Sequence, residues 1–308
     1  MSWNFDAPTG VFRNHALSSD IRMQAMRDAV FQQFASPEKG YGKGKGAAVT
    51  ITRILQLALA GKVSDVDRLP TGRPIVDTKQ VAVSEWGFAI ETTEFEENLT
   101  HYDMRNRFQR MLRDQMKLTM DKMHADANRT TGLVAVPVTA ASLTFESAPA
   151  TLAANANLTI AHLRQMKDRL VQDQVAPTFS NGMHVGILTT RAARGIKNDP
   201  EYKDWFAPTE NNIKGAARLK DVEGFALFET NHQEALDDTL GGPGVCGEAH
   251  FFGDDHAFTA VVEDPEIRAG VPEDLGRFRK VGWVGTIEAG LVWDAAANTR
   301  CIVLSSTP

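Results

Sequence analysis

The sequence predicts an α+β fold, in which strands and helices share one chain without regular strand–helix alternation. Two observations support this prediction. Residues 100–131 contain no glycine or proline and have the apolar spacing of one long helix, and segments typical of strands lie on both sides of it. Because these strands do not alternate regularly with helices, a doubly wound parallel sheet is not expected.

The composition is that of a globular protein. Of the 308 residues, 43% are hydrophobic and 23% are charged, and the net charge is −6. Residues 1–53 hold seven bases and four acids, a balance of +3, so the remainder carries −9. A mildly basic arm on an acidic body fits a part that lies near a polyanion without reading its sequence, although a solvated arm explains the charge equally well.

The sequence shows no sign of secretion or of membrane insertion. Its two cysteines, Cys246 and Cys301, are too few for a disulfide framework and fit a reducing compartment. The first twenty residues lack the apolar core of a signal peptide, and no segment approaches the ~20 apolar residues of a membrane span. We therefore expect a soluble protein that is made in the cytoplasm and has no membrane contact.

Residues 1–46 are predicted to form an arm that ends in a joint. Residues 21–34 have the apolar spacing of a short helix, which Asp20 could cap. Glycine then occupies every second position at Gly40, Gly42, Gly44 and Gly46. This spacing removes side-chain restriction from the backbone and predicts a flexible joint.

Residues 47–92 are predicted to form an extended two-stranded arm. Alternating apolar residues over 47–92 indicate two long strands with a polar tip between them, and the apolar phase slips by one residue between Val83 and Trp86. A two-stranded ribbon is only marginally stable alone. We therefore expect this ribbon to lie against another surface, such as a neighbouring subunit.

Residues 100–131 are predicted to form the long helix, which at ~1.5 Å per residue would be about 45 Å long. Five of the ten methionines lie on its apolar face, and core packing is favoured over an adaptable binding groove. The opposite face is basic, so it is either solvated or turned toward a polyanion. Its candidate residues are Arg105, Arg107, Arg110, Arg113 and Lys117.

The rest of the chain mixes short helices and strands over residues 155–282 and ends in apolar strands over 283–308. Helices are expected at 159–171, 189–198 and 199–205, and strands at 183–188, 225–229 and 248–262, the last interrupted at 253–255. Residues 281–293 and 301–304 are predicted to form a hairpin-like ending.

A search for catalytic chemistry finds one weak metal candidate. It comprises Cys246, Glu248, His250, Asp254 and His256, whose side chains are of the types that bind zinc. Their spacing matches no CxxC or HExxH pattern, and a strand that ends in an acidic turn explains the same residues. We therefore expect no metal, no cofactor and no enzyme activity, with a metal-dependent enzyme as the alternative.

Several segments, in order along the chain, resemble the capsid proteins of tailed bacteriophages with the Hong Kong 97-type fold, in the N-four-like podovirus branch. These segments are residues 85–91 with 95–97, 187–194, 198–204, 222–231 and 247–255. The resemblance covers residues 45–308. It implies an N-terminal arm with its joint (1–46), an extended loop (47–94), a peripheral domain with a spine helix (95–154), an axial domain (155–282) and return strands to the peripheral domain (283–308).

The resemblance implies a major capsid protein that assembles with itself into hexamers and pentamers of an icosahedral head around double-stranded DNA. The basic helix face would then meet packaged DNA without base specificity. A separate scaffolding protein is implied, because the first 45 residues are too short for a built-in scaffold. A portal protein is also implied, and a decoration protein is left open.

The implied location is the virion, with assembly in the cytoplasm of the host bacterium. Neither Lys62 nor Lys79 can be matched to a cross-linking lysine of the family, so no covalent cross-link is expected. A nanocompartment shell that encloses enzyme cargo is the alternative with the same fold.

Overall fold

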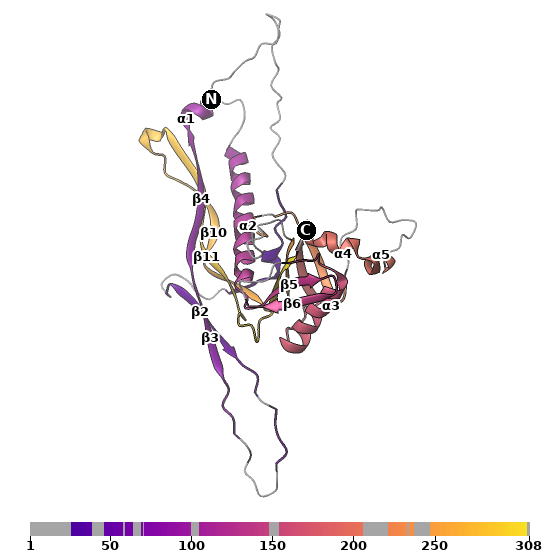
Figure 1. Cartoon of the computed structure of the whole chain (residues 1–308). Coiled ribbons are helices and arrows are strands. Elements are labelled where there is room, and N and C mark those ends of the chain that lie inside the picture. The colour runs from indigo at the N-terminus through magenta and orange to yellow at the C-terminus, as the bar shows by residue number, and fades with distance from the viewer. Residues whose placement is uncertain are drawn as a thin grey trace, which may run out of the picture.

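The computed structural model describes residues 26–38, 46–57, 59–63, 69, 71–99, 105–147, 154–205, 221–232, 234–236 and 247–306. They form an elongated body from which one two-stranded ribbon projects (Figure 1). The helices are α1 (Glu94–Leu99), α2 (Arg105–Arg129), α3 (Ile160–Asp168), α4 (Thr190–Asn198) and α5 (Pro200–Trp205), with 3₁₀ turns η1 (Phe31–Phe34) and η3 (Asp274–Gly276) and a π-helical turn η2 (Arg169–Asp173). The strands are β1 (Ser36–Glu38), β2 (Ala48–Ile54), β3 (Val76–Ala82), β4 (Ser84–Thr93), β5 (Val134–Thr139), β6 (Ser142–Glu146), β7 (His184–Thr189), β8 (Phe225–Thr230), β9 (Gly247–Phe252), β10 (Ala257–Ala269), β11 (Phe278–Leu291) and β12 (Cys301–Ser306).

The strands make three sheets. A six-stranded sheet has the order β6-β5-β12-β9-β7-β8, a four-stranded sheet has the order β1-β10-β11-β4, and β2 pairs with β3 alone. Helix α2 runs along the four-stranded sheet, whereas α3, α4 and α5 lie on the side of the six-stranded sheet (Figure 1). The predicted α+β class is confirmed.

The long helix α2 forms where the sequence predicts it and packs against the four-stranded sheet. Met120, Met123 and Ala127 share a buried cluster with Ile287 and Ala289 of β11. Core packing thus explains the described methionines at the C-terminal half of the apolar face, as expected of an amphipathic helix.

The chain leaves α2 by passing close to the segment that follows β11. The N–H of Gly132 donates to the carbonyl oxygen of Asp294 at 2.8 Å. A Cβ on Gly132 would lie 2.7 Å from the backbone nitrogen of Ala296, so only glycine allows this approach.

The six-stranded sheet holds the main core. Every residue of β9 and β12 is buried, and Phe251, Leu163 and Met166 belong to one apolar cluster beneath α3 and α4. Helix α3 begins after its N-cap residue Thr159, whose N–H donates to Nδ1 of His162 at 3.2 Å. The predicted short helices and strands of this region are confirmed.

Three local predictions are wrong. The helix predicted over 21–34 is a single 3₁₀ turn at Phe31–Phe34 within its described part, and residues 21–25 lie outside the described residues. The ribbon ends at Ala82, because β4 leaves it to pair with β11. There Trp86 lies opposite Gly285 and packs against the buried cluster between α2 and β11. The predicted terminal hairpin is absent, because β11 and β12 belong to different sheets.

Candidate assembly site

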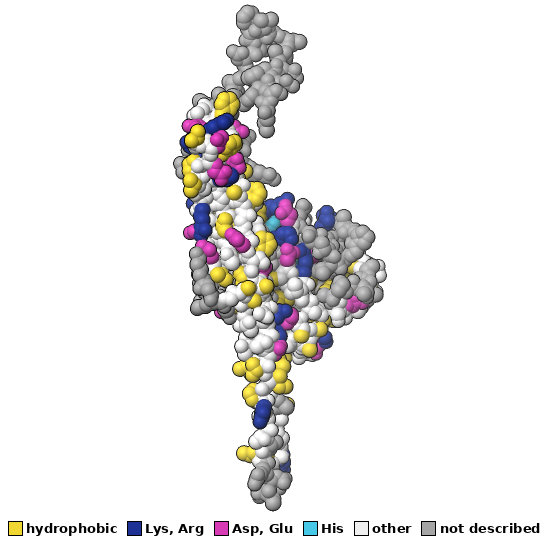
Figure 2. Space-filling view, turned by 90° about the vertical axis from the view of Figure 1, so that its left-hand side faces the viewer, with side chains coloured by type: hydrophobic (Ala, Val, Ile, Leu, Met, Phe, Trp, Pro, Cys, Tyr) yellow, Lys and Arg dark blue, Asp and Glu magenta, His cyan; other side chains and the backbone are white. Residues whose placement is uncertain are grey.

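The ribbon exposes a concentrated set of large hydrophobic side chains. Seven of the fourteen that the described residues expose lie between residues 54 and 76. They are Ile54, Leu57, Leu59, Val63, Leu69, Ile75 and Val76. Figure 2 shows the ribbon as a narrow stalk with hydrophobic side chains along it, clear of the body. An exposed apolar surface of this kind marks an interaction site, because solvent would otherwise contact it at a cost in free energy.

A charged anchor holds the base of the ribbon on the body. Asp294, which follows β11, accepts hydrogen bonds from Arg53 Nη1 at 2.8 Å and from Lys79 Nζ at 2.7 Å. These two residues stand on β2 and β3, so both ribbon strands are held by one carboxylate. Burial alone would raise the pKa of Asp294, but the hydrogen bonds from Lys79 and Arg53 lower it below the usual value.

Beside this charged anchor, side chains of the ribbon also pack against apolar side chains of the body. Val49 is buried with Phe258 and Val292, and the Arg53 guanidinium lies over the Trp293 ring at 5.6 Å from its centroid. The sequence alternation placed Val49, Ile51 and Arg53 on one strand face, and this alternation is the signal that could have identified Arg53 as an inward residue. Beyond Ile54 the described ribbon residues are largely exposed.

Only some of the predicted basic residues of α2 form a common exposed surface. Arg110, Arg113 and Lys117 are exposed, stand three and four residues apart, and make no ion pair with any described residue. Arg107 is half-buried, and Arg105 is described for its backbone alone. Three of the five predicted residues thus form one cationic stripe that has no ion pair within the described part of the chain.

Glu248, His250 and His256, three residues of the metal candidate, contact other side chains within the protein. Glu248 lies within 2.8 Å of both Arg129 Nε and His250 Nε2, and its side chain is 1% exposed. Burial raises the pKa of Glu248, but hydrogen bonds from His250 and Arg129 outweigh it and lower the pKa to about 2. His256 instead stacks on Phe252 at 3.9 Å between ring centroids, and Asp254 is exposed.

Cys246 lies outside the described residues. Within the described part of the chain, no three His, Cys, Asp or Glu side chains come together in a metal-binding arrangement. Glu248 and His250 therefore have a structural role, in which Glu248 binds the C-terminal turn of α2 and His250 binds Glu248.

None of the helices in the described part of the chain is both long and apolar enough to cross a bilayer.

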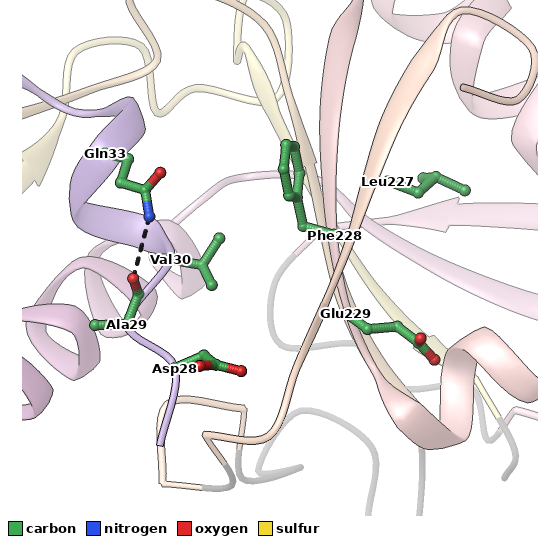
Figure 3. Close-up of a pocket in the computed structure, with 7 residues that line it drawn as sticks. All are labelled: Asp28, Ala29, Val30, Gln33, Leu227, Phe228 and Glu229. Atoms are coloured by element: carbon green, nitrogen blue, oxygen red, sulfur yellow. Dashed lines mark hydrogen bonds between the residues drawn. The ribbon is translucent and has the colours of Figure 1, made fainter. Parts of the chain in front are cut away.

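A cleft of about 500 Å³ lies between residues 28–33 and the edge strand β8. Figure 3 shows Val30 facing Phe228 across it, with Asp28 and Glu229 at one end. Gln33 donates from Nε2 to the carbonyl oxygen of Ala29 at 3.2 Å, and Glu229 is bound by Lys197. The described residues that line the cleft combine the carboxylates of Asp28 and Glu229 with the apolar side chains of Val30, Leu227 and Phe228.

No family model matches the sequence, and no curated protein matches it. Solved structures do match over nearly the whole chain. The capsid of cyanophage Pam1 matches with a TM-score of 0.70 and 17% identity, over 99% of both chains. The chain has the fold of phage capsid proteins.

Other phage structures share this capsid fold. The capsid of Ralstonia phage GP4 matches 100% of this chain and 98% of its own, with a TM-score of 0.70 and 12% identity. The capsid of Helicobacter pylori bacteriophage KHP30 matches 97% of both chains, with a TM-score of 0.67 and 11% identity. The expected phage capsid fold is therefore confirmed, while the division into domains and the podovirus branch stay predictions.

Proposed function

We propose that this chain is a major capsid protein, which assembles with itself into hexamers and pentamers of an icosahedral phage head. The observation that carries the proposal is the ribbon, since half of the large hydrophobic side chains that the described residues expose stand on it, beyond the charged anchor. The capsid fold, matched from end to end, supports the same role. The proposed role is mechanical and needs no catalytic group.

The physical basis of assembly is burial on a neighbour. The distal ribbon cannot bury Leu57, Leu59 and Ile75 within its own chain, so a neighbouring copy would remove this surface from water at about 25 cal/mol per Å². Each such contact is modest. A closed shell repeats it around symmetry axes, and many weak contacts then hold the container together.

The content of the shell is proposed to be double-stranded DNA. Arg110, Arg113 and Lys117 make no ion pair with any described residue, which leaves their charge available to a phosphate backbone. Such contacts are independent of base sequence. This stripe favours a DNA-filled head over a nanocompartment with enzyme cargo.

The proposed partners are a separate scaffolding protein, a portal protein and the packaged DNA, with the virion as the final location after assembly in the host cytoplasm. The glycine joint is proposed to let one sequence adopt hexamer and pentamer positions. Gly46 has φ +112°, a conformation suited to glycine, whereas Gly40, Gly42 and Gly44 lie outside the described residues.

Sedimentation velocity on ribbon variants tests the proposal. The triple variant Leu57→Ser, Leu59→Ser and Ile75→Ser is expected to fold, because these side chains are exposed, but to sediment as single subunits under conditions where the unmodified chain assembles. Val171→Ser, at an exposed valine in η2 and not on the ribbon, is the matched control and is expected to assemble normally. Unchanged assembly of the triple variant would contradict the proposed role of the ribbon.

A further inference from the structure

A lysine and a buried histidine form a direct hydrogen bond between α3 and β7. Lys167, in the last turn of α3, has its Nζ 2.9 Å from Nδ1 of His184, the first residue of β7. The Nε2 of the same imidazole lies 3.2 Å from the carbonyl oxygen of Ala176. A carbonyl oxygen only accepts hydrogen bonds, so Nε2 carries the hydrogen and the lone pair of Nδ1 faces Lys167.

The surroundings of this pair favour the uncharged forms of both side chains. His184 is fully buried, and its ring contacts the equally buried ring of Phe225 at 5.8 Å between centroids. Within the described part of the chain, Lys167 has no carboxylate partner. Burial lowers the pKa of Lys167, and burial together with the neighbouring Lys167 charge lowers the pKa of His184.

Lys197 provides a matched contrast in the same chain. It stands in the last turn of α4, as Lys167 does in α3, and both residues are half-buried. Lys197 Nζ, however, donates to both carboxylate oxygens of Glu229, at 2.7 and 2.9 Å. A carboxylate keeps its lysine protonated, whereas a neutral imidazole can accept a proton. Of these two lysines, Lys167 is therefore the one that can lose its proton to its partner.

The geometry around Lys167 is that of an activated nucleophile. A nucleophile becomes reactive when a base lies within hydrogen-bond reach and a third group fixes the orientation of that base. Lys167 Nζ, His184 Nδ1 and the carbonyl oxygen of Ala176 meet these conditions in that order. The amine also lies directly against the backbone of Gly224, where an added Cβ would stand 2.8 Å from Nζ. Glycine at this position therefore leaves room for the amine.

We propose that Lys167 is an acylation site, which takes a small acyl group from an activated donor, either an acyl phosphate or an acyl thioester. Nζ forms a bond to the carbonyl carbon of the donor, and the bond from that carbon to the phosphate oxygen or to the thioester sulfur breaks. The leaving group departs with the electron pair, and His184 Nδ1 takes the proton that Nζ loses. The product is an uncharged amide at Lys167. The inference does not depend on the proposed self-assembly.

Competitive labelling of the unmodified, full-length chain tests the proposal. The protein is treated briefly with acetyl phosphate at neutral pH, and mass spectrometry of its peptides then measures acetylation at each lysine. Lys167 should react at least about fivefold faster than Lys197, a modest part of the gain that a positioned base provides. The same measurement with an acetyl thioester distinguishes the two donor classes, and the faster donor is the one that the site takes. Labelling of Lys167 no faster than that of Lys197 with either donor would overturn the inference.

Replacement of the base tests the role of His184. His184→Asn keeps a side-chain amide near the position of Nδ1, but an amide does not take up a proton at neutral pH. Labelling of Lys167 should fall to the rate of Lys197, while the rate at Lys197 stays unchanged and reports that the fold is retained. An unchanged rate at Lys167, or an equal fall at both lysines, would overturn the assignment of His184 as the base. The comparison of Lys167 with Lys197 in the unmodified chain needs no variant, so it decides the inference even if His184→Asn does not fold.

Discussion

Arg129, in the last turn of α2, donates from Nε and Nη2 to the two carboxylate oxygens of Glu248 in β9, each at 2.8 Å. The Arg129 side chain is 10% exposed and that of Glu248 is 1% exposed. Arg129 Nη2 also donates to the carbonyl oxygen of Ala235 at 2.7 Å. This bidentate pair joins the end of the long helix to the middle of the six-stranded sheet.

Glu248→Gln should destabilise the subunit by about 3 kcal/mol, because it leaves the Arg129 charge without its buried counter-ion. Urea denaturation followed by circular dichroism measures the change. Asp173→Asn breaks the exposed Arg169–Asp173 pair and is the control, with an expected change of about 0.5 kcal/mol or less. Equal effects of the two variants would show that the Arg129–Glu248 pair contributes no more than a surface pair.

Acid should destabilise the fold in a range set by two buried histidines. Burial lowers the pKa of His124 to about 4 and that of His256 to about 3. The unfolded chain takes up protons below its ordinary histidine pKa of about 6.5, whereas the folded chain does not until these lower values. Their contribution is therefore fully present above about pH 6.5 and is lost as the pH falls toward 4 and then 3.

His124→Gln should remove one of the two histidines whose protonation makes the unfolding free energy depend on pH. The slope of unfolding free energy against pH, measured by urea denaturation between about pH 6 and pH 4.5, should fall by roughly 1.4 kcal/mol per pH unit relative to the unmodified chain. Glu248, whose pKa is about 2, adds a further loss only below its ordinary value near 4.3, as the pH falls toward 2. An unchanged slope in His124→Gln would mean that His124 is already protonated in the folded protein.

Gly195→Ala should destabilise the subunit, although the same change in an open helix would stabilise it by roughly 1 kcal/mol. Gly195 lies within α4, and a Cβ there would stand 2.4 Å from the carbonyl oxygen of Leu158. Displacing that backbone should cost about 1–3 kcal/mol. Gly61→Ala, whose Cβ would meet nothing within 4 Å, is the control for thermal denaturation, and a Gly195→Ala subunit as stable as the unmodified one would contradict the packing described.

Lys79→Gln should loosen the ribbon without unfolding the body. Lys79 Nζ binds Asp294 at 2.7 Å, while Arg53 still holds the same carboxylate. Hydrogen exchange of the β2 and β3 amides should therefore become several-fold faster, with β9 and β12 unchanged. Lys62→Gln, at an exposed position of the distal ribbon, should have no effect, and equal exchange in both variants would remove Lys79 from the anchor.

The elements that the sequence predicts best are those whose local pattern agrees with their final packing. The long helix is predicted because the spacing of Met116, Met120 and Met123 matches the face that packs on β11. The shell-forming role followed from a resemblance over the chain, and the structure adds the distribution of exposed hydrophobic residues that supports it.

Features that depend on pairing between residues distant in sequence could not be predicted. Nothing local in the sequence distinguishes a strand that continues the ribbon at residue 84 from one that pairs with Gly285, about 200 residues later. The partners of Asp294, Arg53 and Lys79, likewise lie more than 200 residues away in sequence. The basic stripe was found by helical spacing alone, but the half-burial of Arg107 could not be predicted from spacing.

Negative-stain electron microscopy of the purified, expressed chain is the most direct measurement of the central claim, that this subunit works by assembling with itself. The account predicts rings of five or six subunits or closed icosahedral particles. A uniform population of single subunits, at concentrations at which the protein stays folded, would contradict it.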